Sequence, residues 1–145
     1  LAAARSGDLG KAALAQSNDP GRVDSASAFD PARTNRSTPR EMTQLLRAIW
    51  RDEAAPPEAC AKVRAVMAQQ VSSRLGRDLP DGAVVAGKTG SLTGRVRNEV
   101  GVITHANGRA FAVAVFTRAH RPFERVASIE AAIATNASAA ISALR

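Results

Sequence analysis

Aromatic side chains are scarce in this chain of 145 residues: they make up 3% of it, and tyrosine is absent. Proteins that bind single-stranded nucleic acid usually stack the bases on aromatic side chains interleaved with basic ones. The arginines behind the net charge of +7 are scattered along the chain, without a dense run. We therefore predict a solvated, arginine-rich surface and no nucleic-acid partner. The same charge also suits an anionic small ligand such as a carboxylate.

Patterns for metal binding, disulfides and membrane insertion are missing as well. Cys60 is the only cysteine, so no intrachain disulfide forms, no redox compartment is indicated, and a buried small hydrophobe is the expected role. His105 and His120 have no partners at metal-ligand spacing. No apolar run approaches the length that spans a membrane. We expect no metal, no cofactor and no membrane partner.

Small apolar side chains dominate what is present. Apolar residues, mostly alanine and valine, make up 45% of the chain, which is enough for one compact core of helices against a sheet. Residues 1–37 are predicted to hold a helical piece over 1–17 and a long, Ω-like loop over 18–37. Loops of that length are usually functional or disordered. The regular periodicity lies in residues 38–145, which are predicted to form the folded region.

Two helices are predicted to follow each other directly. Thr38 supplies an N-cap, Pro39 occupies the first helical position, and Glu41 completes a capping box. A second helix is predicted to start at Pro56-Pro57-Glu58 and to end before Gly76. The first helix carries one apolar stripe through Trp50, formed by Met42, Leu45, Leu46 and Ile49.

Beyond Pro80 the pattern becomes that of strands. The segment 83–89 is a short apolar run with a polar end, 96–104 alternates, and 111–117 is apolar on both faces, which predicts a central, covered strand. Asn107-Gly108 predicts a tight hairpin in which both residues accept positive φ. From Phe123 the helical period returns. The predicted fold class is α+β, with a three-stranded antiparallel sheet flanked by helices.

The motif that carries chemistry is Lys88-Thr89-Gly90-Ser91, at the end of a predicted strand. An ammonium and a hydroxyl favour a substrate carboxylate, and Gly90 leaves the strand edge bare so that an acyl group can lie along it. The backbone N–H of Ser91 can act as one oxyanion donor. Taken alone, these residues fit a polar strand end running into a turn equally well.

The surrounding order makes the resemblance specific. The segment 35–42, with Thr38-Pro39 opening a helix, resembles the segment after the Ω-loop of class A β-lactamases, and Lys-Thr-Gly is the box of those enzymes and of penicillin-binding proteins. Arg97, nine residues after Lys88, is similar to a family arginine that approaches the substrate carboxylate. The resemblance covers roughly residues 35–145. It implies the C-terminal portion of the serine β-lactamase fold.

By this resemblance the chain would be a β-lactamase-like serine acyl hydrolase, acting on a β-lactam or a related amide or ester. Lys88 and Ser91 would be catalytic, while Thr89, Gly90 and Arg97 would bind a carboxylate or acyl substrate. The alternative is a catalytically silent remnant that acts as a binding or assembly module through its sheet edge and arginine surface. A basic nucleic-acid binder is a third, weaker reading.

Departures from the family pattern narrow this reading. The nucleophile's Ser-x-x-Lys element is missing, as are Ser-Asp-Asn and a glutamate within residues 18–37. Without a nucleophile no covalent acyl intermediate forms. Three explanations stay open: half of a split or proteolysed enzyme, a truncated product that dimerises, or a protein whose other half is absent from this chain. We favour a fragment or half-enzyme. The lysines at 11, 62 and 88 are preceded three residues earlier by Asp8, Ala59 and Val85.

One physical consequence concerns the last predicted strand. In the family, the strand equivalent to residues 109–117 lies in mid-sheet and pairs with an N-terminal strand that this chain lacks. An apolar strand left unpaired along one edge tends to pair with other chains. We therefore expect this edge to be covered by the N-terminal half of the fold, by a second copy, or by residues 1–17.

Overall fold

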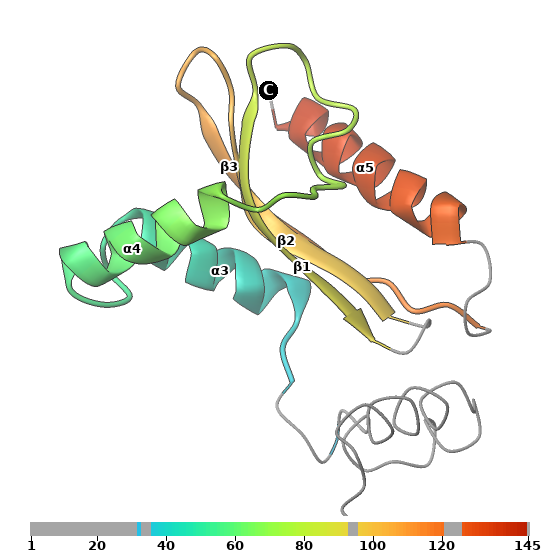
Figure 1. Cartoon of the computed structure of the whole chain (residues 1–145), viewed down its shortest axis with the longest axis horizontal. Helices are drawn as coiled ribbons and strands as arrows, with labels where there is room; N and C mark the ends of the chain where they lie inside the picture. The colour runs from blue at the N-terminus through green and yellow to red at the C-terminus, as the bar shows by residue number, and fades with distance from the viewer. Residues whose placement is uncertain (1–31, 33–35, 93–95, 121–125, 145) are drawn as a thin grey trace, which may run out of the picture. The chain divides into compact units, whose positions relative to one another are not determined.

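The computed structural model describes residue 32 and residues 36–92, 96–120 and 126–144. The chain divides into two units, Leu1–Arg36 and Ser37–Arg145, and the helix predicted over 1–17 lies outside the described residues. The second unit shows helices with a three-stranded antiparallel sheet, which confirms the predicted fold class (Figure 1). Its elements are α3 (Pro39–Trp50), α4 (Pro57–Ala68), β1 (Val84–Leu92), β2 (Val96–Thr104), β3 (Ala110–Val115) and α5 (Val126–Ala143).

Helix α3 begins as its sequence predicts. The backbone N–H of Glu41 donates to the Thr38 hydroxyl at 3.2 Å, and the Glu41 carboxylate accepts from the Thr38 N–H at 2.8 Å. This reciprocal capping box satisfies two N–H groups that have no partner within the helix. Arg64 of α4 then joins the two helices, because its guanidinium donates to the carbonyl of Ile49 at 2.6 Å and pairs with Asp52 at 2.7 Å.

Strand β2 is the central strand of the sheet. It pairs antiparallel with β1 from Val84↔Thr104 to Leu92↔Val96, and with β3 from Glu99↔Val115 to Thr104↔Ala110. Gly101 on β2 lets β1 approach closely, since a Cβ atom there would lie 2.7 Å from the carbonyl oxygen of Ala86. Any side chain at this position would force the two strands apart.

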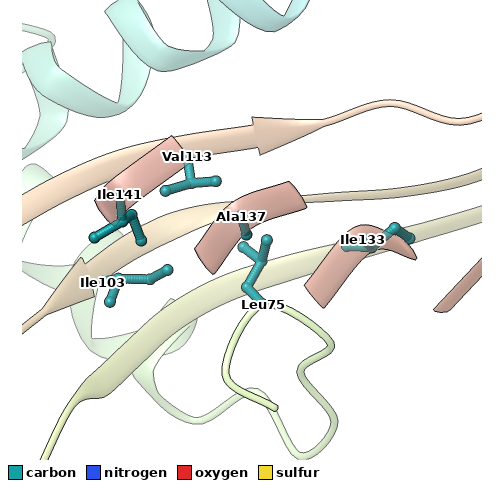
Figure 2. Packing of buried hydrophobic residues seen from close by; sticks show 6 residues of the cluster. All are labelled: Leu75, Ile103, Val113, Ile133, Ala137 and Ile141. Atoms are coloured by element: carbon teal, nitrogen blue, oxygen red, sulfur yellow. The ribbon is translucent and has the colours of Figure 1, made fainter. Parts of the chain in front are cut away.

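The hydrophobic core lies between the sheet and α5. Leu75, which follows α4, packs with sheet and α5 residues in one cluster (Figure 2). Successive side chains of a strand point to opposite faces. Val102 and Ala112 therefore face α3, away from this cluster, and line a cavity with α3 residues. The sheet lies between α5 on one face and α3 with α4 on the other (Figure 1). The cluster consists of Leu75, Ile103, Val113, Ile133, Ala137 and Ile141.

Helix α5 corrects one expectation from the sequence. It is long and apolar enough, by length and composition alone, to cross a membrane, although no segment was expected to approach that length. Ile133, Ala137 and Ile141 on one side of it are buried in the cluster with the sheet, and Glu130 forms ion pairs with arginines from other segments. These contacts pack one side of α5 against the sheet.

Strand β3 is covered on both faces but is not central in the described sheet. The sequence predicted a central strand over 111–117, whereas β3 runs over Ala110–Val115 and forms the outer strand. Its apolar pattern reflects α3 on one face and α5 on the other, and coverage of the faces does not require a partner on each edge. Within the described part of the chain, β2 is its only neighbouring strand.

The hairpin between β2 and β3 has a longer turn than predicted. His105 N–H donates to the carbonyl of Arg109 at 2.9 Å, which leaves three residues, Ala106 to Gly108, in the loop. Gly108 has a φ of 82°, while Asn107 is not in the left-handed region. A three-residue loop needs glycine only at its last position, so the prediction of positive φ at Asn107 was wrong.

Candidate active site

The Lys-Thr-Gly box occupies the second half of β1, which is the other outer strand of the described sheet. Lys88, Gly90 and Ser91 are exposed, and Thr89 is half-buried. The Lys88 ammonium donates to the carbonyl oxygen of Thr89 at 2.6 Å. The ammonium therefore lies over the backbone of its own strand, with the rest of its surface open to solvent.

The register shows which way the Ser91 N–H points. Arg97 N–H donates to the carbonyl of Thr117, on the β3 side of β2. Both backbone groups of one strand residue point to the same side, so Arg97 and its β1 partner Ser91 form a pair without mutual hydrogen bonds. The N–H of Ser91 must therefore point away from β2, to the outer edge of β1. The Thr89 carbonyl that holds Lys88 points the same way, by the same alternation.

The Ser91 N–H and the Lys88 ammonium thus lie along one edge. No strand in the described residues pairs with that edge. Gly90 lies between Thr89 and Ser91, and a Cβ atom there would meet only the Cβ of Asn98, at 3.8 Å. The outer edge of β1 therefore presents an N–H donor and an ammonium, and no side chain at position 90 separates them.

The Arg97 side chain does not lie on the same face of the sheet as Lys88. By the pleat, Arg97 and Thr89 face α5, on the side opposite to Lys88. The Arg97 guanidinium pairs with Glu130 of α5 at 3.6 Å and is 18% exposed. The sequence places Lys88 and Arg97 at one site, while the structure places them on opposite faces of the same strand pair.

The buried charge around Glu99 was not predicted from the sequence. Glu99 is fully buried, and its carboxylate accepts from the Ser73 hydroxyl at 2.7 Å and from the Arg74 N–H at 2.8 Å. The Arg74 guanidinium lies 3.7 Å from Glu99 and 3.3 Å from Glu130. One feature of the sequence could have indicated this burial. Glu99 alternates with Gly101 and Ile103 along β2, so its side chain lies on the face that packs on α5.

Two cavities lie away from the box. One of about 410 Å³ lies at the tip of the β2–β3 hairpin, lined by residues that include Asp81, His105 and Arg109. Another of about 610 Å³ lies along β3 beside α3, lined by residues that include Trp50, Phe111 and Ala112. Neither is lined by the five predicted site residues. In residues 36–92, 96–120 and 126–144 there is no cluster of three or more metal-ligating side chains.

Comparison with known proteins gives the class of the fold. The structure of a TLA-1 extended-spectrum β-lactamase superposes with a TM-score of 0.70 at 27% identity, over 94% of this chain and 53% of that one. A β-lactamase from Sphaerobacter thermophilus is 35% identical with a TM-score of 0.63, over 74% of this chain and 40% of that one. The helices and antiparallel sheet are therefore those of part of a class A β-lactamase fold.

The sequence gives the family. Residues 6–144 match the β-lactamase enzyme family. A β-lactamase regulatory protein, BlaB of Streptomyces cacaoi, is 37% identical over 69% of this chain and 36% of its own length. The chain belongs to the β-lactamase enzyme family. It spans about half or less of the length of these solved relatives, and about a third of the curated one.

Proposed function

We propose that this chain supplies one wall of a β-lactamase-like acyl-hydrolase site. The observation that carries the proposal is the outer edge of β1, where the Lys88 ammonium and the outward N–H of Ser91 flank Gly90. A carboxylate on the ligand would bind the ammonium, and the Ser91 N–H would stabilise an oxyanion. The Thr89 hydroxyl would donate a hydrogen bond to the ligand carboxylate. Arg97 would add positive potential from the face of the sheet that packs on α5.

The second wall would come from the N-terminal half of the fold, because this chain carries no Ser-x-x-Lys element. Its docking place would be the outer edge of β3, which has no partner strand among the described residues. The 610 Å³ cavity beside that edge, with Trp50, Phe111 and the exposed Leu144 that follows α5, would receive side chains from the added strand. A second copy of this chain is the other candidate for this edge.

Turnover and acylation test the proposal. The purified chain is incubated with nitrocefin and with a fluorescent penicillin, alone and mixed with the portion of the Sphaerobacter thermophilus enzyme that lies outside the match. We expect no reaction from either polypeptide alone and both turnover and covalent labelling from the mixture. A mixture that forms a complex but neither labels nor turns over contradicts the catalytic role.

The alternative is a binding or assembly module without catalysis. One observation favours it: the curated relative at 37% identity is named as a β-lactamase regulatory protein, not as an enzyme. This alternative predicts that the β1 edge binds a β-lactam reversibly and that the β3 edge binds another polypeptide. Light scattering with and without benzylpenicillin distinguishes the two, because only the module would change its assembly without consuming the ligand.

A further inference from the structure

The exposed tip of the β2–β3 hairpin carries Asn107-Gly108, the only place in the sequence where glycine follows asparagine. From the geometry of this tip we propose that Asn107 is a modification site, at which the chain deamidates itself to aspartate and isoaspartate. The tip lies at the end of the β1–β2 pair where Val84 meets Thr104, away from the Lys-Thr-Gly box. Asn107 therefore reacts independently of the proposed acyl-hydrolase site.

The reaction begins when the backbone nitrogen of Gly108 attacks the side-chain carbonyl carbon of Asn107. A bond forms between these two atoms, the bond from that carbon to the amide nitrogen breaks, and ammonia leaves with the proton that Gly108 loses. The product is a five-membered succinimide. Water then adds to one of the two ring carbonyl carbons, and the ring opens to aspartate or to isoaspartate. Water is the only co-reactant, and both residues are exposed to it.

One hydrogen bond activates the Asn107 carbonyl for this attack. The backbone N–H of Arg109 donates to Asn107 Oδ1 at 3.1 Å, so the side chain folds over the backbone of the residues that follow it. The bond draws electron density away from the carbonyl carbon. As the attack proceeds, negative charge develops on Oδ1, and the Arg109 N–H stabilises it as an oxyanion donor does.

Gly108 brings no side chain that could hinder the attack. It adopts a φ of 82°, which other residues rarely do, and the space where a Cβ atom would lie is open. One contact opposes the reaction: the Gly108 N–H donates to the carbonyl of His105 at 2.8 Å. The nitrogen can attack only when this bond opens. Exposed turns with few contacts open at a low cost in free energy, so the opening of the hairpin tip sets the rate.

The modification changes the charge of the 410 Å³ cavity that Asn107 helps to line. Asp81 and Arg109 line the same cavity, and their opposite charges cancel. A carboxylate at position 107 gives the lining a net negative charge and so a preference for cations. Isoaspartate also adds one carbon atom to the main chain of the loop, whose length is set by the hydrogen bond from His105 to Arg109. It should therefore loosen the hairpin tip.

The test follows the full chain by peptide mass spectrometry during incubation at mildly alkaline pH. The peptide that holds Asn107 should gain the mass difference between an amide and an acid, matched by released ammonia. Asn98 and Asn136 are controls within the same molecule, because residues with side chains bulkier than that of glycine follow them. We expect both to stay unchanged while Asn107 is converted.

Two variants at the tip sharpen the test. Gly108→Ala should slow the conversion about tenfold, because its methyl group shields the attacking nitrogen and raises the barrier. Ala106→Ser, which changes an exposed neighbour and none of the reacting atoms, should convert at the rate of the wild type. Conversion of Asn107 no faster than that of Asn98, or equal rates for Gly108→Ala and wild type, would overturn the proposal.

The consequence of the modification is measured on the aged chain. It should elute from a cation-exchange column earlier than fresh chain and together with Asn107→Asp, because both carry one more negative charge. In the isoaspartate fraction, the amide hydrogen of His105 should exchange faster than it does in Asn107→Asp. Equal exchange in the two would contradict the loosening of the hairpin tip.

Discussion

The two outer edges of this sheet differ in almost every property. The β1 edge ends in Lys88, Gly90 and Ser91, which are exposed and polar or bare, while the β3 edge is formed by an alternation of alanine with valine and phenylalanine. An unpaired strand offers the same N–H and C=O groups in both cases. We propose that what lies beside those groups decides their use: an ammonium would favour a small anionic ligand, and the cavity lined in part by Trp50, Phe111 and Ala112 would favour another strand.

The central strand β2 connects these two edges, and Glu99 fixes it to the segment that follows α4. Replacing Glu99 by alanine should cost about 3–5 kcal/mol of unfolding free energy, because it removes the buried carboxylate that accepts from the Ser73 hydroxyl and the Arg74 N–H and that pairs with the Arg74 guanidinium. That is a large fraction of the stability of a small domain. Urea denaturation followed by circular dichroism measures the change. A loss below about 1 kcal/mol, as expected for a surface glutamate such as Glu58, would show that the network does not anchor the sheet.

Proline substitution tests the function of the β1 edge without breaking the sheet. Ser91→Pro removes an N–H that points away from β2, so the β1–β2 hydrogen bonds should survive. Turnover in the completed site should fall about 10²- to 10³-fold if this N–H is an oxyanion donor. Ser91→Ala is the matched control, since it removes the hydroxyl and keeps the N–H. Equal rates for the proline and alanine variants would exclude the N–H from the chemistry.

The alternating direction of backbone N–H groups also suggests a matching proline substitution on β3. Arg97 N–H points toward β3, so residues 111, 113 and 115 bond to β2 and the N–H of Ala112 points outward. Ala112→Pro should weaken the association of a completing strand roughly tenfold, because main-chain hydrogen bonds carry strand addition. Isothermal titration calorimetry with the completing polypeptide measures this, with Ala112→Ser as the control that keeps the N–H. Unchanged affinity for the proline variant would place the partner elsewhere.

The smallest expected effect lies away from both edges. Thr38→Ala removes the hydroxyl of the α3 capping box and should cost about 1 kcal/mol in thermal or chemical unfolding. Neither ligand binding nor strand association should change. Serine at this position should restore most of the loss, because it retains the hydroxyl that accepts the Glu41 N–H. A change in ligand affinity would mean that α3 positions the β1 edge, contrary to the comparison above.

Local signals in the sequence predicted the local structure well. Thr38, Pro39 and Glu41 fix the start of α3 through contacts within four residues, and Pro57 does the same for α4. The three strands and the long last helix follow from their periodicity. These features depend on neighbours along the chain, so one sequence is enough to reveal them.

The arrangement around Arg97 depends on contacts that are distant in sequence. Arg97 faces α5 because of the register with β1, and Glu130 holds it from 33 positions further along the chain. Glu99 is likewise satisfied by Ser73 and Arg74, which follow another helix. The family resemblance assigned Arg97 to the same site as Lys88, but a resemblance in sequence does not reveal which face of the strand a side chain takes or which partner holds it.

The most direct test of the contrast between the two edges is one amide spectrum of the ¹⁵N-labelled chain titrated with benzylpenicillin. We expect saturable shifts at Thr89 and Ser91 on the β1 edge, with Ala112 on the β3 edge unmoved. Equal shifts along both edges, or shifts confined to β3, would contradict it.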